Sequence, residues 1–93
     1  MIRSFRAGET ERIWRGERSR RLPYEVQVAA RRKLRYLDQV RRLAELAVPP
    51  GNRLEALSED RAGQYSIRID DQWRICFAWR DGDAEDVEIV DYH

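Results

Sequence analysis

The hydrophobic pattern of this chain changes its period once, and that change limits the possible folds more than any other feature of the sequence. Residues 24–46 contain no glycine or proline, and their apolar side chains recur every three or four positions, which predicts one long amphipathic helix. The prolines and glycine in residues 49–52 end this helix. Beyond them, apolar and polar residues alternate, which predicts strands. The apolar stripe of the helix consists of Val26, Ala30, Leu34, Leu37, Val40 and Ala44.

The remaining segments complete an α+β chain. Residues 2–5 predict a short strand and residues 9–14 a short helix. The economical packing is a single domain over residues 1–93, in which two N-terminal helices cover one face of a small twisted antiparallel sheet. The element order is then β-α-α-β-β-β-β. The later strands are expected at residues 53–57, 65–69, 73–79 and 87–90.

Composition is typical of a small folded protein. The charged fraction of 38% is high, but the net charge is only +1 and the chain has three tryptophans and four tyrosines, so disorder is not expected. Cys76 and His93 are the only residues of their types, which excludes an internal disulfide and argues against a zinc site. The arginine-rich start has no apolar signal region, and the longest apolar run, 75–79, is too short to span a membrane. We therefore expect a soluble cytoplasmic protein.

Charge is distributed unevenly along the chain. Residues 1–46 carry a net charge of +7, and residues 47–93 carry −6. The basic half suggests a polyanionic partner such as nucleic acid. Two solvated faces of one fold are the alternative, which the near-neutral total favours. Residues 16–23, with several arginines and a glycine, are expected to be mobile in the free protein.

The strict alternation of residues 65–79 predicts the register of a hairpin. Because the large side chains must share one face, Ile69 pairs with Trp73 across a three-residue loop. This register places Arg68 directly opposite Arg74 on the other face, where like charges destabilise a sheet. We expect the helices to cover the aromatic face and to leave the arginine face open. The other apolar pairs in this register are Ile67 with Ile75 and Tyr65 with Phe77.

An open face with two opposed arginines predicts a site for an anion. A nearby carboxylate, either Glu55 or Asp91, or a bound phosphate would relieve the repulsion. Solvated arginines tied to local acids are the alternative. If the terminal His93 joins a carboxylate and the arginines, the group suits phosphoryl transfer, with one side chain to take a proton, one to donate it and the arginines to hold the phosphate. By itself, a terminal histidine is more often a frayed surface residue.

Several segments resemble the HigB group of bacterial toxins in the RelE/ParE superfamily, close to its GraT-like branch. The likeness covers nearly the whole chain and is carried by residues 1–5, 49–57, 63–69, 72–77 and 91–93. It implies a RelE-like fold with two helices on a twisted antiparallel sheet. It also implies cleavage of messenger RNA in the ribosomal A site without a metal or cofactor, in which the 2′-hydroxyl attacks its own phosphate and leaves a cyclic phosphate.

The resemblance further implies the partners of such a toxin. They are a HigA-like helix-turn-helix antitoxin, the ribosome and its messenger RNA. Operator DNA is expected to bind only through the toxin–antitoxin complex, and no membrane is involved.

The resemblance assigns roles to residues on the predicted open face. Arg74 matches the arginine that stabilises the transition-state phosphate, His93 the general acid and Glu55 the base. Glu55 stands where some HigB toxins carry histidine, and Ser58 where some carry lysine, so one positive charge is lost and cleavage is expected to be weaker. The candidate RNA- and phosphate-binding residues are Arg53, Arg68, Asp91 and Tyr92 on the sheet, and Arg31 and Arg32 on the basic helix.

Two other functions stay open at the level of sequence. A ParE-like toxin shares the fold but binds DNA gyrase and cleaves no RNA. A catalytically weak binding protein would interfere with ribosome function or assembly. The combination of Glu55, Arg74 and His93 argues against the ParE-like toxin, whereas a catalytically weak toxin would have the same sequence features.

Overall fold

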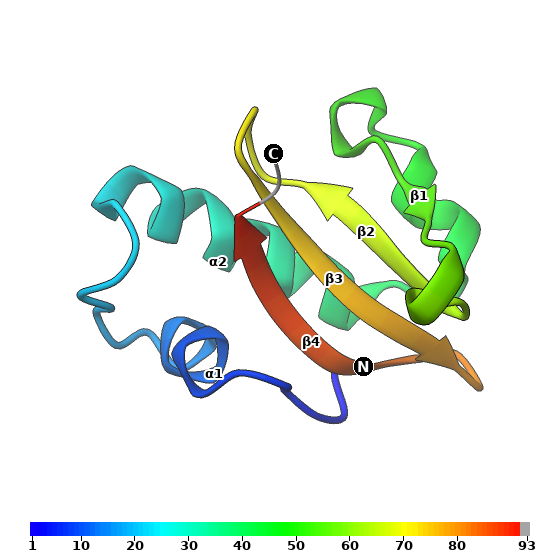
Figure 1. Ribbon diagram of the computed structural model, residues 1–93, viewed down its shortest axis with the longest axis horizontal. Helices are drawn as coiled ribbons and strands as arrows, with labels where there is room; N and C mark the ends of the chain where they lie inside the picture. The colour runs from blue at the N-terminus through cyan, green and yellow to red at the C-terminus, as the bar shows by residue number, and fades with distance from the viewer. Residues whose placement is uncertain (92–93) are drawn as a thin grey trace.

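The computed structural model describes residues 1–91, except for the side chain of Glu59, as a layer of helices on a four-stranded antiparallel sheet (Figure 1). The strands lie in the order β1-β2-β3-β4, and the core forms between the two layers. The α+β class and the arrangement predicted from the sequence are confirmed. The helices are α1 (Gly8–Trp14) and α2 (Tyr24–Gln39), and the strands are β1 (Glu55–Ala56), β2 (Gln64–Arg68), β3 (Trp73–Arg80) and β4 (Asp83–Asp91).

The predicted hairpin register is confirmed, and it fixes what each face of the sheet presents. In β2 and β3, Ile67 pairs with Ile75 and Arg68 pairs with Arg74. The apolar members of these pairs face the helices and have no exposed surface. Each large apolar side chain buried in this way stabilises the fold by roughly 1.5–3 kcal/mol. The fully buried core residues from both layers include Ile13, Leu34, Leu37, Ile67, Ile75, Phe77 and Val87.

The long helix ends earlier than its sequence pattern predicts. Helix α2 stops at Gln39, and the buried Val40 is already extended. The backbone N–H groups of residues 41 and 42 donate to the carboxylate of Glu45 at 3.1 and 2.8 Å, which starts a separate 3-10 turn. That turn brings Leu46 back into the core with no exposed surface. The prediction of one helix over residues 24–46 is therefore wrong for residues 40–46.

The predicted first strand is also wrong. Residues 2–5 form only two isolated parallel bridges with β4, at Ile2–Ala84 and Phe5–Val87. Opposite β3, strand β4 has a bulge near Asp86, whose φ is 52°. Only these two positions of the N-terminal segment pair with β4, so the segment does not form a continuous strand. Figure 1 shows this segment (blue) beside β4 at the edge of the sheet.

Strand β1 is shorter than the predicted residues 53–57. Only Glu55 and Ala56 pair with β2. Arg53 lies outside the strand because its backbone adopts a left-handed conformation, with φ 45° and ψ 58°. No helix among residues 1–91 is both long and apolar enough to cross a membrane.

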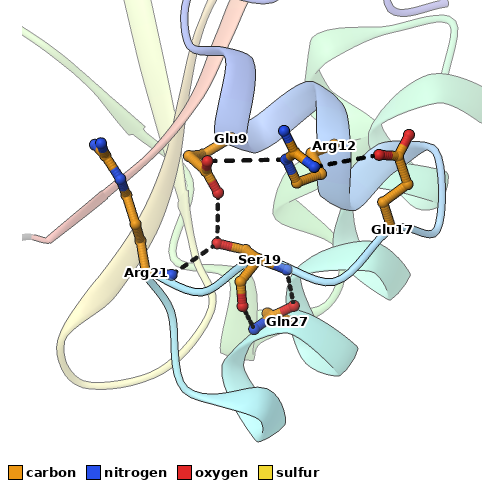
Figure 2. A network of polar contacts seen from close by, with 6 residues as sticks. All are labelled: Glu9, Arg12, Glu17, Ser19, Arg21 and Gln27. Carbon is orange, nitrogen blue, oxygen red and sulfur yellow. Dashed lines mark hydrogen bonds and ion pairs between the residues drawn. The ribbon is translucent and has the colours of Figure 1, made fainter.

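The loop between α1 and α2 is tied down by polar contacts (Figure 2). Ser19, which is 3% exposed, donates its hydroxyl to Glu9 at 2.6 Å and its backbone N–H to Gln27 Oε1 at 2.8 Å. The amide nitrogen of Gln27 donates to the carbonyls of Ser19 and Leu22 at 2.8 and 2.6 Å. These hydrogen bonds argue against the mobility expected for residues 16–23.

Candidate functional site

The sheet face away from the helices carries two rows of mainly polar side chains. Residues paired directly across neighbouring strands share a face, and side chains two positions apart along a strand do so as well. The predicted placement of the opposed arginines on this face is confirmed. We call this surface the open face. Its first row is Glu55, Ser66, Cys76 and Glu88, and its second row is Arg68, Arg74 and Val90.

Arg74 is buried on this face rather than exposed on it. The residue is 8% exposed. Its Nε donates to Ser66 Oγ at 2.9 Å, and its Nη2 donates to the carbonyl of Arg53 at 2.6 Å. Its Nη1 lies 3.9 Å from Glu55 Oε1. The guanidinium is therefore held in one orientation by neighbouring groups, and the expectation of an arginine open to solvent is wrong for this residue.

Arg68 turns to a different carboxylate, although it pairs with Arg74 in the sheet. Its Nη2 donates to Asp71 in the hairpin loop. Each arginine thus has its own acid, Asp71 for Arg68 and Glu55 for Arg74. Local acids relieve the repulsion between the two guanidinium groups, as the alternative interpretation of the sequence proposed, although Arg74 is not solvated.

The structure does not bring Asp91 into the row of Arg74. Asp91 pairs with Trp73, whereas Val90 pairs with Arg74. Its Oδ2 accepts a hydrogen bond from Gln72 Nε2 at 3.1 Å. Asp91 therefore lies at the end of β4, in register with the aromatic side of β3.

The remaining predicted site residues fall in two places. Arg31 and Arg32 belong to α2, in the layer that covers the other face of the sheet. The Nε of Arg31 donates to the carbonyl of Ile13 at 3.2 Å, so this guanidinium helps to join the two helices. Tyr92 and His93 lie outside the described residues.

The end of the first row is an ion pair beside a buried thiol. Arg61 Nη1 lies 3.1 Å from Glu88 Oε1, and Cys76 in the next strand is 1% exposed. Burial raises the pKa of the Cys76 thiol, with an opposing effect from Arg61. A raised pKa keeps the thiol protonated at neutral pH, which argues against a role for Cys76 as a nucleophile.

Sequence analysis missed Ser66, which accepts a hydrogen bond from Arg74, and the hydrogen-bonded pair Lys33 and Asn52. Ser66 has the strand parity of Arg68, so its place on the open face was predictable from the alternation alone. Lys33 and Asn52 carried no such signal, because they come from α2 and from the 3-10 turn at Pro50–Asn52. Lys33 Nζ donates to Asn52 Oδ1.

The two helices on an antiparallel sheet define a RelE-like fold. The structure is similar to the crystal structure of YafQ from E. coli strain BL21(DE3), with a TM-score of 0.58 and 12% sequence identity over 98% of this chain and 93% of that chain. At this identity the likeness shows the fold alone.

The sequence identifies the family. Residues 3–93 match the profile described as "RelE-like toxin of type II toxin-antitoxin system HigB". The chain is also 41% identical to Toxin HigB-1 of Vibrio cholerae serotype O1 over 68 residues, which cover 73% of this chain and 72% of that toxin. The chain therefore belongs to the HigB-like toxins, which confirms the resemblance noted in the sequence. A type II toxin has an antitoxin as its partner.

Proposed function

We propose that this toxin is a ribosome-dependent endoribonuclease that cleaves messenger RNA in the A site and thereby inhibits translation and growth. The observation that carries the proposal is the guanidinium of Arg74, held by Ser66 and Arg53 beside the carboxylate of Glu55. A cation fixed before the substrate arrives stabilises developing phosphate charge without reorganising during the reaction. Membership of the HigB-like toxins supports the same activity.

In the proposed reaction the RNA supplies its own nucleophile. Glu55, whose side chain is 53% exposed, takes the proton from a ribose 2′-hydroxyl. The 2′-oxygen forms a bond to the adjacent phosphorus while the bond from phosphorus to the 5′-oxygen breaks. Arg74 stabilises the charge that builds on the phosphate, and His93 donates a proton to the leaving 5′-oxygen. The products are a cyclic phosphate and a free 5′-hydroxyl, and no metal takes part in these steps.

Wider contacts of the complex belong to the same proposal. Basic side chains bind the RNA backbone through its phosphates, without base specificity and with strong salt dependence. The ribosome and its messenger RNA are the target in the cytoplasm, and a HigA-like antitoxin neutralises the toxin. Operator DNA is bound only through the toxin–antitoxin complex. The proposed RNA-binding residues are Arg53, Arg68, Asp91, Tyr92, Arg31 and Arg32.

Primer extension on a defined messenger RNA with programmed ribosomes tests the proposal. We expect cuts in the A-site codon with the wild-type toxin, and a loss of roughly 10²–10³-fold in rate for Arg74→Ala, as for other fixed groups that stabilise a transition state. A form lacking His93 should lose the cuts as well. Arg80→Ala is the matched control, because Arg80 lies on the same strand with a side chain that is 72% exposed.

Growth arrest without any cuts would contradict the nuclease. The next assays would then measure gyrase inhibition, as expected for a ParE-like toxin, and ribosome assembly. Retained antitoxin binding by Arg74→Ala shows that a loss of cutting is not a loss of fold.

A further inference from the structure

Two hydrogen bonds, joined by the peptide link between Asn52 and Arg53, connect the helix layer to Arg74. It begins at Lys33 on α2, whose Nζ donates to Asn52 Oδ1. The next residue, Arg53, presents its backbone carbonyl to Arg74 Nη2 at 2.6 Å. A side chain on the covered side of the sheet is thus joined, through one turn of backbone, to the guanidinium on the open face.

Asn52 is placed to hold this turn in one conformation. The residue has no exposed surface. Its Nδ2 donates to the carbonyl of Leu46 at 3.1 Å, and its backbone N–H donates to the carbonyl of Pro49 at 3.0 Å. With Lys33 bound to Oδ1, both ends of the amide are engaged, so the orientation of a fully buried side chain is determined.

The carbonyl that receives Arg74 belongs to an unfavourable backbone conformation. Arg53 has a positive φ of 45°, which costs a residue other than glycine roughly 1–2 kcal/mol. Such a conformation persists only where neighbouring contacts enforce it. If the turn relaxed towards the right-handed or extended region, the Arg53 carbonyl would rotate away from Arg74.

Electrostatics do not explain why a lysine occupies position 33. Burial lowers the pKa of Lys33, and the nearby Arg32 and Arg68 lower it further. Among the carboxylates that the structure describes, which exclude that of Glu59, none forms an ion pair with its amine. The favourable interaction that the structure gives this amine is its hydrogen bond to Asn52.

We propose that Lys33 and Asn52 are positioning residues for Arg74. By locking the turn at Pro50–Asn52, they hold the Arg53 carbonyl where it orients the guanidinium. Neither residue touches RNA in this role. The effect on cleavage rests on the proposed function, whereas the effect on the orientation of Arg74 does not.

The first measurement separates kcat from KM for A-site cleavage in Lys33→Met. Misplacement of a catalytic group lowers the rate of chemistry, so we expect kcat to fall about tenfold with KM unchanged. Lys33→Arg keeps a donor for Asn52 and should restore most of the rate. In an Arg74→Ala background, Lys33→Met should have no further effect, because residues that act through one group are not additive.

The second measurement follows Arg74 directly. The Nε–H of Arg74, bonded to Ser66, should give a slowly exchanging ¹H–¹⁵N signal that disappears in Arg74→Lys. We expect faster exchange in Lys33→Met and in Asn52→Ala. Arg41→Met is the control that removes an exposed positive charge close to the end of α2. If Lys33→Met does not fold, Lys33→Gln, which is too short to reach Asn52, takes its place.

The cleavage kinetics and the exchange rate of the Arg74 Nε–H together show which of the two proposals fails. Faster exchange in a toxin that does not cleave RNA would support the positioning role and overturn the nuclease. Cleavage with unchanged kcat and unchanged exchange in both variants would overturn the positioning role alone. A rise in KM with unchanged kcat would mean that Lys33 contacts RNA itself, which would also overturn it.

Discussion

The two faces of the sheet bury their side chains by different physical means. On the helix side, Phe77 and Ile75 have no exposed surface and pack among apolar residues of α2. On the open face, Ser66 is fully buried and Arg74 is 8% exposed, but both are held by hydrogen bonds. Apolar contact has no direction and tolerates changes that keep volume. A buried charged group, in contrast, destabilises the fold when any one of its hydrogen-bond partners is lost.

This difference explains how the open face can carry a site. Arg74 is nearly as buried as a core residue, and its hydrogen bonds to Ser66 and Arg53 set the orientation of its guanidinium. The helix side stabilises the fold through buried apolar area, whereas hydrogen bonds on the open face orient the guanidinium of Arg74. Substitutions on the two faces should therefore fail in different ways, which the following experiments measure.

The largest effect is expected on the helix side. Phe77→Ala should lower the free energy of unfolding by about 3–5 kcal/mol, because it removes a large ring and leaves a cavity. Urea denaturation measures this loss. Phe77→Leu keeps most of the apolar volume and should lose less. A loss below about 1 kcal/mol for Phe77→Ala would show that the core repacks and would remove the contrast between the faces.

On the open face, a single hydroxyl should matter. Ser66→Ala removes the acceptor of Arg74 Nε and should lower the free energy of unfolding by about 1.5–3 kcal/mol, the usual range for a hydrogen bond to a charged group. Ser66→Thr keeps the hydroxyl as a control. Equal stability of Ser66→Ala and the wild type would mean that the buried guanidinium of Arg74 does not need the Ser66 hydroxyl.

The loop between the helices, like the open face, is held by the hydrogen bonds of a buried polar side chain, Gln27. Gln27 is 3% exposed and bonds to Ser19 and Leu22. Gln27→Ala leaves these buried backbone groups without partners and should lower the free energy of unfolding by about 1–2 kcal/mol. It should also make residues 16–23 susceptible to trypsin, which cleaves after arginine. Gln39→Ala, at an exposed position, is the control, and equal cleavage of both would contradict the prediction.

The smallest effect is expected at the edge of the sheet. The hydrogen bond from Arg3 lowers the pKa of Asp83 below its usual 3.8, and the amino group of Met1 adds to this. The stability that Asp83 contributes is therefore complete above its unfolded pKa and is lost as pH falls through the lower folded value. Melting temperatures of the wild type and Asp83→Asn should differ at about pH 5 and converge towards about pH 2. A difference that stays constant over this range would contradict the assignment.

Much of the fold was predictable because the spacing of apolar residues along the chain determines where helices and strands form. The alternation of residues 65–79 gave the hairpin register and placed Arg68 opposite Arg74. The errors lie where local pattern competes with remote contacts. Helix α2 ends early because Glu45 captures two backbone N–H groups. The N-terminal segment pairs only at Ile2 and Phe5, with residues of β4 that lie 82 positions further along the chain.

The candidate site divides in the same way. The sequence by itself determined the family, the two layers, and which face carries Glu55, Arg68 and Arg74, since side-chain direction alternates along a strand whatever surrounds it. Only the tertiary structure decided that Arg74 is buried and oriented. Its acceptor at Arg53 lies 21 positions away, and Lys33 and Asn52 lie 19 positions apart. The alternation of residues along a strand predicts which face a side chain occupies. The partners of a buried polar group, however, come from segments that meet only when the chain folds.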